Sequence, residues 1–210
     1  MRGSAMSEAR DPMAAPPEAR AGEGLARAFS HGRPALVVYL MAGYPDRAGS
    51  LAAMRAAADA GADLIELGVP YTDALADGPV IVRAANAAIK AAGGRFGLEE
   101  SLDLAAEFTR SAVSVPPVAL MTYYNPMLRR GLRRTADDAR RAGVSGFIVP
   151  DLPPDEAGPW LDVSEGMDTV FLAAPTSTPE RLALVGSSSS GFVYCVSTTG
   201  ITGERAELPP

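Results

Sequence analysis

The sequence has few residues that could form crosslinks or bind metal. Its 210 residues include one cysteine and one histidine. Cys195 alone excludes an internal disulfide and favours the reducing cytoplasm, and its apolar surroundings predict that it is buried. A zinc site needs three or four ligands, and a catalytic triad needs a histidine in the core of the fold. His31 precedes the first predicted strand, so we expect no metal site and no triad.

Positive charge and long apolar runs are also scarce. The net charge is −6 with a pI near 4.9, which argues against nucleic-acid binding. An anionic small substrate remains compatible, because backbone N–H groups at a helix N-terminus can bind phosphate. No run of 18 apolar residues predicts a membrane span, and no early apolar stretch predicts a signal peptide. Residues 1–22 are expected to form a disordered tail, and residues 23–210 a single catalytic domain.

From residue 35 onward, short apolar segments alternate with alanine-rich ones. Apolar residues on both faces are typical of parallel strands covered by helices. The predicted strands are Ala35–Met41, Asp63–Val69, Val118–Tyr123, Gly146–Pro150, Thr169–Ala173 and Gly191–Ser197. The predicted helices are Ser50–Ala60, Pro79–Ala92, Leu98–Ser111, Thr135–Ala142, Pro154–Val163 and Pro179–Val185.

This alternation predicts an α/β fold built from β/α units. An open doubly wound sheet and a closed (β/α)₈ barrel both fit it. Neither G-x-G-x-x-G nor G-x-x-x-x-G-K-[ST] is present, which weakens the open-sheet alternative. Residues 204–210 hold no seventh strand, so we expect the first six units of the barrel.

The second predicted strand contains the first candidate catalytic residue. Side chains alternate along a strand, so Ile65 and Leu67 point to one face, and Glu66 points to the other, into the barrel. Desolvation there would raise the pKa of Glu66 and suit it to acid–base catalysis. A structural carboxylate paired with a nearby donor is the alternative.

A second carboxylate, Asp77, follows the same strand. Helix capping is the simpler interpretation, because Gly78-Pro79 and a helix come next. Loops after barrel strands build active sites, however, so Asp77 is also a candidate partner for Glu66. Tyr39, Tyr123 and Tyr194 lie on or at the ends of other strands and are candidates to line a pocket; core packing is the alternative for each.

Several segments together resemble a known family. The segment E-L-G-V-P-Y-T-D-A-L-A-D-G-P at residues 66–79 closely resembles the signature of tryptophan synthase α chains. Supporting matches follow in order: Y-L-M-A-G-Y-P at 39–45, M-T-Y-Y-N-P at 121–126, V-P-D-L-P at 149–153 and G-I-T-G at 200–203. The resemblance covers roughly residues 22–210.

The resemblance implies a TIM-barrel lyase of tryptophan biosynthesis. The expected reaction is retro-aldol cleavage of indole-3-glycerol phosphate to indole and glyceraldehyde 3-phosphate. Glu66 matches the catalytic glutamate, which moves protons at indole C3 and the glycerol hydroxyl. Asp77 matches the aspartate that accepts a hydrogen bond from the indole N–H and stabilises positive charge. Tyr39, Tyr123 and Tyr194 match pocket positions.

The resemblance also implies a mobile loop and a partner. Thr202 and Gly203 match the loop that closes over substrate. The loop at Tyr71, Thr72 and Asp73 is expected to face a pyridoxal-phosphate β subunit in a cytoplasmic α₂β₂ tetramer. No cofactor or metal is expected in this subunit.

Two departures from the family pattern affect the expected activity. Ala74 stands where most members have proline, which would leave the loop before Asp77 less restrained. The family's last two β/α units, whose glycine-rich turns bind the substrate phosphate, have no counterpart in the 210 residues. We therefore expect this polypeptide alone to be weakly active or inactive.

Two other functions compete with the lyase. A non-catalytic α-like chain could bind or regulate the β subunit without turnover. Another barrel enzyme acting on a sugar phosphate is the weaker alternative, because it would have no need of the segment Glu66–Pro79.

Overall fold

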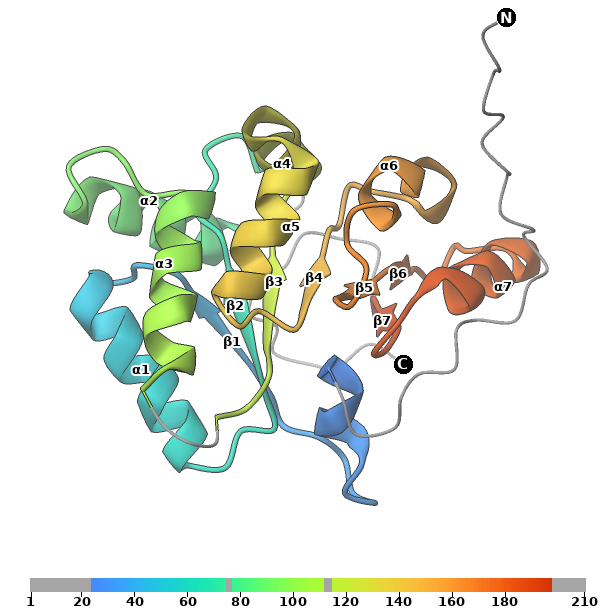
Figure 1. The fold of residues 1–210 in the computed structure, drawn as a ribbon, viewed down its shortest axis with the longest axis horizontal. Coiled ribbons are helices and arrows are strands. Elements are labelled where there is room, and N and C mark those ends of the chain that lie inside the picture. Colours follow the sequence, from blue (N-terminus) through green and yellow to red (C-terminus); the bar gives the residue numbers. More distant parts are fainter. Residues whose placement is uncertain (1–23, 75–76, 112–114, 198–210) are drawn as a thin grey trace, which may run out of the picture.

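The computed structural model describes residues 24–74, 77–111 and 115–197, and the predicted tail at 1–22 lies outside these ranges. Parallel strands alternate with helices, as Figure 1 shows. Five strands pair in sequence order: β1 (Val37–Met41), β2 (Leu64–Gly68), β3 (Val118–Met121), β4 (Gly146–Ile148) and β5 (Asp168–Val170). A second parallel pair consists of β6 (Leu172–Ala173) and β7 (Tyr194–Cys195).

Every predicted strand position carries a strand, and the predicted α/β fold is confirmed. The fifth position differs in detail, since Phe171 separates β5 from β6. Its carbonyl nevertheless accepts a hydrogen bond from the Tyr194 N–H at 3.0 Å. Backbone pairing therefore continues across Phe171, from β4 on one side of this segment to β7 on the other.

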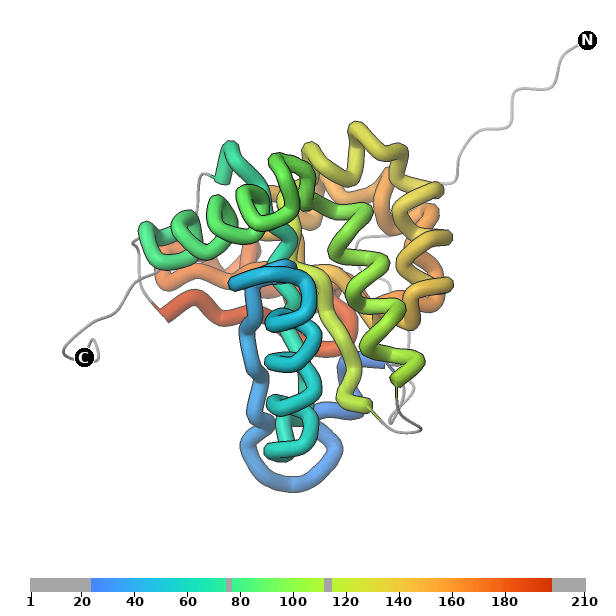
Figure 2. The backbone as a smooth tube through the Cα atoms, turned by 90° about the vertical axis from the view of Figure 1, so that its left-hand side faces the viewer, coloured from blue at the N-terminus to red at the C-terminus, as the bar shows by residue number. Residues whose placement is uncertain are grey.

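The α-helices pack on the outer face of the strands, whereas η1 packs against the inner cluster (Figure 2). The helical elements are η1 (Gly24–Phe29), α1 (Arg47–Asp59), α2 (Pro79–Ala91), α3 (Leu98–Thr109), α4 (Tyr124–Arg130), α5 (Leu132–Arg141), η2 (Pro154–Glu156), α6 (Gly158–Leu161) and α7 (Pro179–Ser188). α1 begins three residues before the predicted Ser50, because the Asp46 carboxylate accepts a hydrogen bond from the Gly49 N–H at 2.8 Å and caps the helix.

The sequence analysis did not predict α4. Its residues Asn125 and Pro126 are typical of a turn. Proline is tolerated in the first helical turn, however, because that turn does not use its N–H groups for helical hydrogen bonds. α4 follows β3 directly and places Tyr124 and Asn125 close to the end of that strand.

Two hydrophobic clusters define the layers. Ile65 and Leu67 belong to the larger cluster, together with Leu51 and Met54 of α1 and residues of α3. Leu64, one residue away on β2, belongs to the second cluster, which contains inward residues of β3, β4 and β5. The predicted alternation along β2 is therefore confirmed, and its inner face points into the ring of strands.

η1 closes the end of the strands opposite α4 (Figure 1). Leu25 of η1 is fully buried, and its N–H donates to the Asp168 carboxylate at 2.7 Å. Gly146 makes room for Leu25, because a Cβ at this glycine would lie 2.7 Å from the Leu25 Cδ1 atom. With this end filled, the carboxyl ends of the strands are left for a site.

The prediction that Cys195 is buried is wrong, since its side chain is exposed. Its neighbour Tyr194 packs against the second cluster, inside the ring of strands. Because side chains alternate along a strand, Cys195 points away from that cluster. Among the described helices, none is long and apolar enough to cross a membrane.

Candidate active site

Glu66 lies in the middle of β2, on the inner face of the sheet. It pairs in register with Tyr39 of β1 and Ala119 of β3. The residue is only 4% exposed, and burial raises the pKa of its carboxyl to about 7. Burial is the sole cause of this shift, and no cation among the described residues offsets it. Glu66 therefore does not behave as a carboxylate paired with a structural cation.

Asp77 lies between β2 and α2, at the carboxyl end of β2. The N-cap of α2 is Gly78, and no side chain makes a hydrogen bond there, so Asp77 does not cap this helix. Burial raises the pKa of Asp77, and a hydrogen bond with the Tyr123 side chain opposes that rise. The hydroxyl of Tyr123 thus favours the ionised form of Asp77, whereas Glu66 has no such support.

Tyr39 and Tyr194 both lie close enough to the carboxyls to feel their charge. Burial raises the pKa of Tyr39 first, and the charges of Asp77 and Glu66 raise it further. Burial also raises the pKa of Tyr194, with a smaller contribution from Glu66. Charges influence a pKa only over short distances. β1, β2 and β7 therefore bring Tyr39, Glu66 and Tyr194 close together, with Asp77 beside Tyr39.

The close approach of Tyr39 depends on Gly68. A Cβ at Gly68 would lie 2.2 Å from the Tyr39 hydroxyl oxygen, so only glycine leaves space for this phenol. Tyr39, Gly68, Asp77 and Tyr123 are among the residues that line a small cavity of about 10 Å³. Alternation along β2 puts Gly68 on the same face as Glu66, but the sequence analysis did not assign it this role. A glycine inside a strand, beside a candidate catalytic residue, was the available signal.

The predicted partner-facing loop lies at the same end of the barrel. Thr72 and Asp73 are exposed, whereas Tyr71 is only half-buried. The Tyr71 hydroxyl accepts a hydrogen bond from the Asn125 Nδ2 atom at 2.9 Å, and its ring lies 5.4 Å from that of Tyr123. The start of this loop is therefore held against α4, a contact that the sequence analysis missed together with the helix.

The structure gathers most of the predicted site residues, but not all of them can be placed. Glu66, Asp77, Tyr39, Tyr123 and Tyr194 come together at one end of the strands. Thr202 and Gly203 lie outside the described residues. Within the described ranges, no three His, Cys, Asp or Glu side chains gather as a metal site would require.

This is a parallel β/α fold in which two acids and three tyrosines gather on the inner face of the strands and in the loops at their carboxyl ends. That arrangement defines the class: an enzyme of the β/α-barrel type. Comparisons with known proteins identify the family. The family model described as tryptophan synthase alpha chain matches residues 25–210. The chain belongs to the tryptophan synthase alpha chain family, and the prediction of a tryptophan-biosynthetic lyase is confirmed at the level of this family.

Individual relatives agree with the family model. The tryptophan synthase alpha chain of Roseiflexus castenholzii is 47% identical over 191 residues, which are 90% of this chain and 72% of the relative. That of Mycobacterium avium is 49% identical over 175 residues, or 82% of this chain and 62% of the relative. The chain thus spans about two thirds of the length of these relatives.

Solved structures support the barrel assignment. A tryptophan synthase structure from Mycobacterium tuberculosis superposes with a TM-score of 0.78 at 44% identity, covering 87% of this chain and 69% of that one. The alpha subunit from Legionella pneumophila gives a TM-score of 0.75 at 32% identity, covering 82% and 65%. The predicted TIM-barrel type of fold is confirmed by these likenesses.

Proposed function

We propose that this chain cleaves indole-3-glycerol phosphate to indole and glyceraldehyde 3-phosphate, with Glu66 and Asp77 as its catalytic residues. The observation that carries the proposal is the difference between the two carboxyls. Burial raises the pKa of Glu66 to about 7, whereas Asp77 has the Tyr123 hydroxyl to favour its ionised form. Two acids in different environments are the arrangement that separates a proton donor from an electrostatic stabiliser.

The proposed reaction begins with proton transfer to the indole ring. Protonated Glu66 donates its proton to indole C3, and positive charge develops on the ring nitrogen. Ionised Asp77 accepts a hydrogen bond from the indole N–H and stabilises that charge. The Glu66 carboxylate then accepts the proton of the glycerol hydroxyl next to C3 as the carbon–carbon bond breaks. The aldehyde forms, and the electron pair of the broken carbon–carbon bond returns to the indole ring. Glu66 is then protonated again, as it was at the start of the cycle.

A partner and a location complete the proposal. The exposed residues Thr72 and Asp73, with Tyr71 beside them, are proposed to face a tryptophan synthase β subunit in an α₂β₂ tetramer. Pyridoxal phosphate belongs to that partner, and this subunit is proposed to need no cofactor. Cytoplasmic location agrees with the single cysteine and with a biosynthetic role.

The direct test is formation of indole from indole-3-glycerol phosphate, measured for the purified chain with and without a β subunit. We expect indole to form in proportion to enzyme, slowly for the chain alone and faster with the partner. If no indole forms under either condition while the β subunit is still activated, the chain is a regulatory protein and the catalytic proposal fails.

Replacing Tyr123 with phenylalanine is expected to lower kcat about tenfold, with little change in KM. The substitution removes a hydrogen bond to a carboxylate, an interaction worth about 1.5–3 kcal/mol. Because that bond opposes the raised pKa of Asp77, the pKa of Asp77 should rise further in the variant. A pH profile of kcat measures both effects.

Tyr124→Phe is the matched control, because the Tyr124 side chain packs against the larger hydrophobic cluster, between the strands and the helices, and not at the site. It should leave the profile unchanged. A Tyr123→Phe enzyme with the kcat and pH profile of the wild type would show that Tyr123 has no influence on Asp77.

A further inference from the structure

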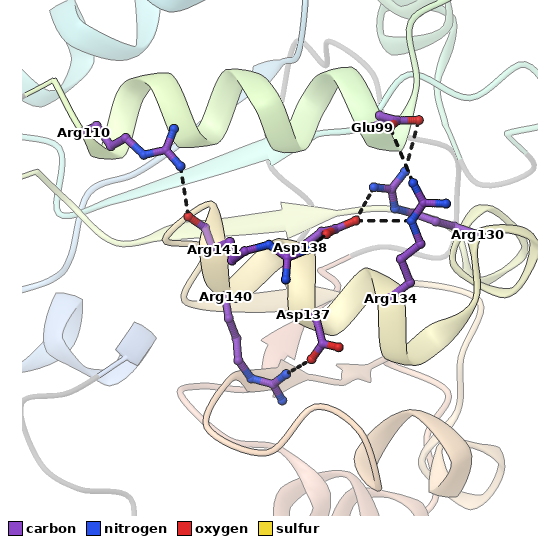
Figure 3. Close-up of polar contacts among 8 residues, drawn as sticks. All are labelled: Glu99, Arg110, Arg130, Arg134, Asp137, Asp138, Arg140 and Arg141. Atoms are coloured by element: carbon purple, nitrogen blue, oxygen red, sulfur yellow. Dashed lines mark hydrogen bonds and ion pairs between the residues drawn. The ribbon is translucent and has the colours of Figure 1, made fainter.

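A second cavity lies outside the ring of strands, between α3 and α5 at the end of α4. Its volume is about 370 Å³, far larger than the space beside Asp77. It is lined by Glu99, Leu102, Asp103, Ala106, Arg110, Arg130, Arg134, Asp138, Arg141 and Ala142. Figure 3 shows the arginines of this cleft together with Glu99 and Asp138.

The carboxylates of this arginine cleft are shared among several guanidinium groups. Asp138 forms ion pairs with Arg130 and Arg141 and with Arg134 at 3.6 Å. Glu99 pairs with Arg130 at 3.3 Å and with Arg134 at 3.9 Å. The hydrogen bond from Arg130 and the charges of all three arginines lower the pKa of Asp138. Two carboxylates thus serve three cations, so these ion pairs leave one positive charge without a partner of its own.

A charge count of the lining gives the same result. Four arginines face three acids, Glu99, Asp103 and Asp138, which leaves one positive charge in a protein whose net charge is −6. One added anion would balance the cleft.

Several N–H groups in the cleft remain available to a ligand. The Arg130 Nε atom has no hydrogen-bond partner among the described residues, but it is buried, so the accessible donors are those of the exposed residues Arg110, Arg134 and Arg141. Arg110 makes a long contact of 3.4 Å with the Arg141 carbonyl. The side chains of Arg134 and Arg141 are 63% and 70% exposed, and each guanidinium has five N–H donors. Planar guanidinium groups with spare donors match the geometry of an oxyanion.

We propose that the arginine cleft binds a small oxyanion of the phosphate class, held by Arg110, Arg134 and Arg141. This site is separate from the catalytic one, because it lies on the helical layer, whereas Glu66 points into the ring of strands. Arg130 ends α4, and α4 begins beside Tyr123. An anion held by Arg110, Arg134 and Arg141 therefore ties the end of α3 to α5, beside the end of α4, and stabilises the folded protein by mass action.

Calorimetric titration with inorganic phosphate at constant ionic strength tests the proposal. The full chain should bind phosphate with saturation, and its melting temperature should rise with phosphate but not with chloride. The double variant Arg134→Gln/Arg141→Gln should bind at least about tenfold more weakly, because it loses charge-assisted hydrogen bonds. Arg129→Gln/Arg133→Gln, which removes two exposed arginines of α4 and α5 that do not line the cleft, is the control matched for charge and should bind as the wild type does.

A variant that is expected to bind phosphate more tightly shows whether the weaker binding of the double variant results from misfolding. Asp103→Asn removes an exposed negative charge from the lining and should tighten phosphate binding severalfold. Phosphate bound at the catalytic site would persist in the double variant and would be unaffected by Asp103→Asn, so the two sites are distinguishable. Absence of saturable binding in the wild type, or equal binding in the double variant, would overturn the proposal. The ion pairs of the cleft would then be a self-contained surface network, which contributes little.

Discussion

Glu66→Gln is expected to lower kcat/KM for indole formation by at least about 10³-fold. Positioned acid–base groups contribute roughly 10²–10⁴-fold to a reaction, and Glu66 is proposed to transfer two protons in each cycle. Glutamine keeps the size of the side chain and its place between Tyr39 and Ala119 but transfers no proton. Single-turnover measurement of indole with saturating enzyme separates this chemical loss from a loss of binding.

Stability provides the control for this variant. The pKa of Glu66 is raised from 4.5 to about 7 in the folded protein, so the stabilisation from its protonated form is complete below the unfolded pKa and is lost as the pH rises through 7. At pH 8 the wild type buries an ionised carboxylate, and glutamine does not. The variant should therefore melt at or above the wild-type temperature at pH 8.

The Glu66→Gln variant also distinguishes the lyase from the alternative functions. If Glu66→Gln forms indole at the wild-type rate, Glu66 has no part in the chemistry. If neither protein forms indole while both activate a β subunit equally, the chain acts as a non-catalytic regulator.

Asp77→Asn is expected to lower kcat about 10²-fold or more. The amide keeps the hydrogen-bonding shape of the side chain but has no charge to stabilise a protonated indole ring. Removing one electrostatic stabiliser from an active site typically costs about 10²–10³-fold. The change should appear in kcat more than in KM, because ring charge develops mainly in the transition state.

Asp73→Asn makes a matched control in the same loop. Asp73 is exposed and is proposed to face the β subunit, so this substitution should leave indole formation by the chain alone unchanged. Equal losses for the two variants would indicate that overall loop charge, and not Asp77 itself, governs the rate.

Much of the fold was predictable because its signals are local. Buried parallel strands leave short apolar segments, and Gly61 and Pro79 mark helix ends in the sequence as they do in the structure. Alternation along β2 was enough to predict that Glu66 points inward. Segments 39–45 and 66–79 indicated the family because several matched in order.

The remaining features depend on contacts between distant segments. Nothing near Gly68 in the sequence shows that the Tyr39 phenol fills the space above it. The bond between Asn125 and Tyr71 joins residues 54 positions apart, and α4 itself looked like a turn. Cys195 looked buried from its apolar neighbours, yet its exposure depends on which face of β7 turns inward. The arginine cleft likewise appears only when α3 and α5 lie side by side.

The titration of the Glu66 carboxyl tests the central claim most directly. Carbon-detected NMR of glutamate-labelled protein, with Glu66→Gln used to assign the resonance, gives the midpoint of this single group. A midpoint near pH 7 is predicted, since burial in the ring of strands is the cause of the shift. A midpoint near the ordinary value of 4.5 would show that this side chain is solvated or paired, and the proposed proton transfer would lose its basis.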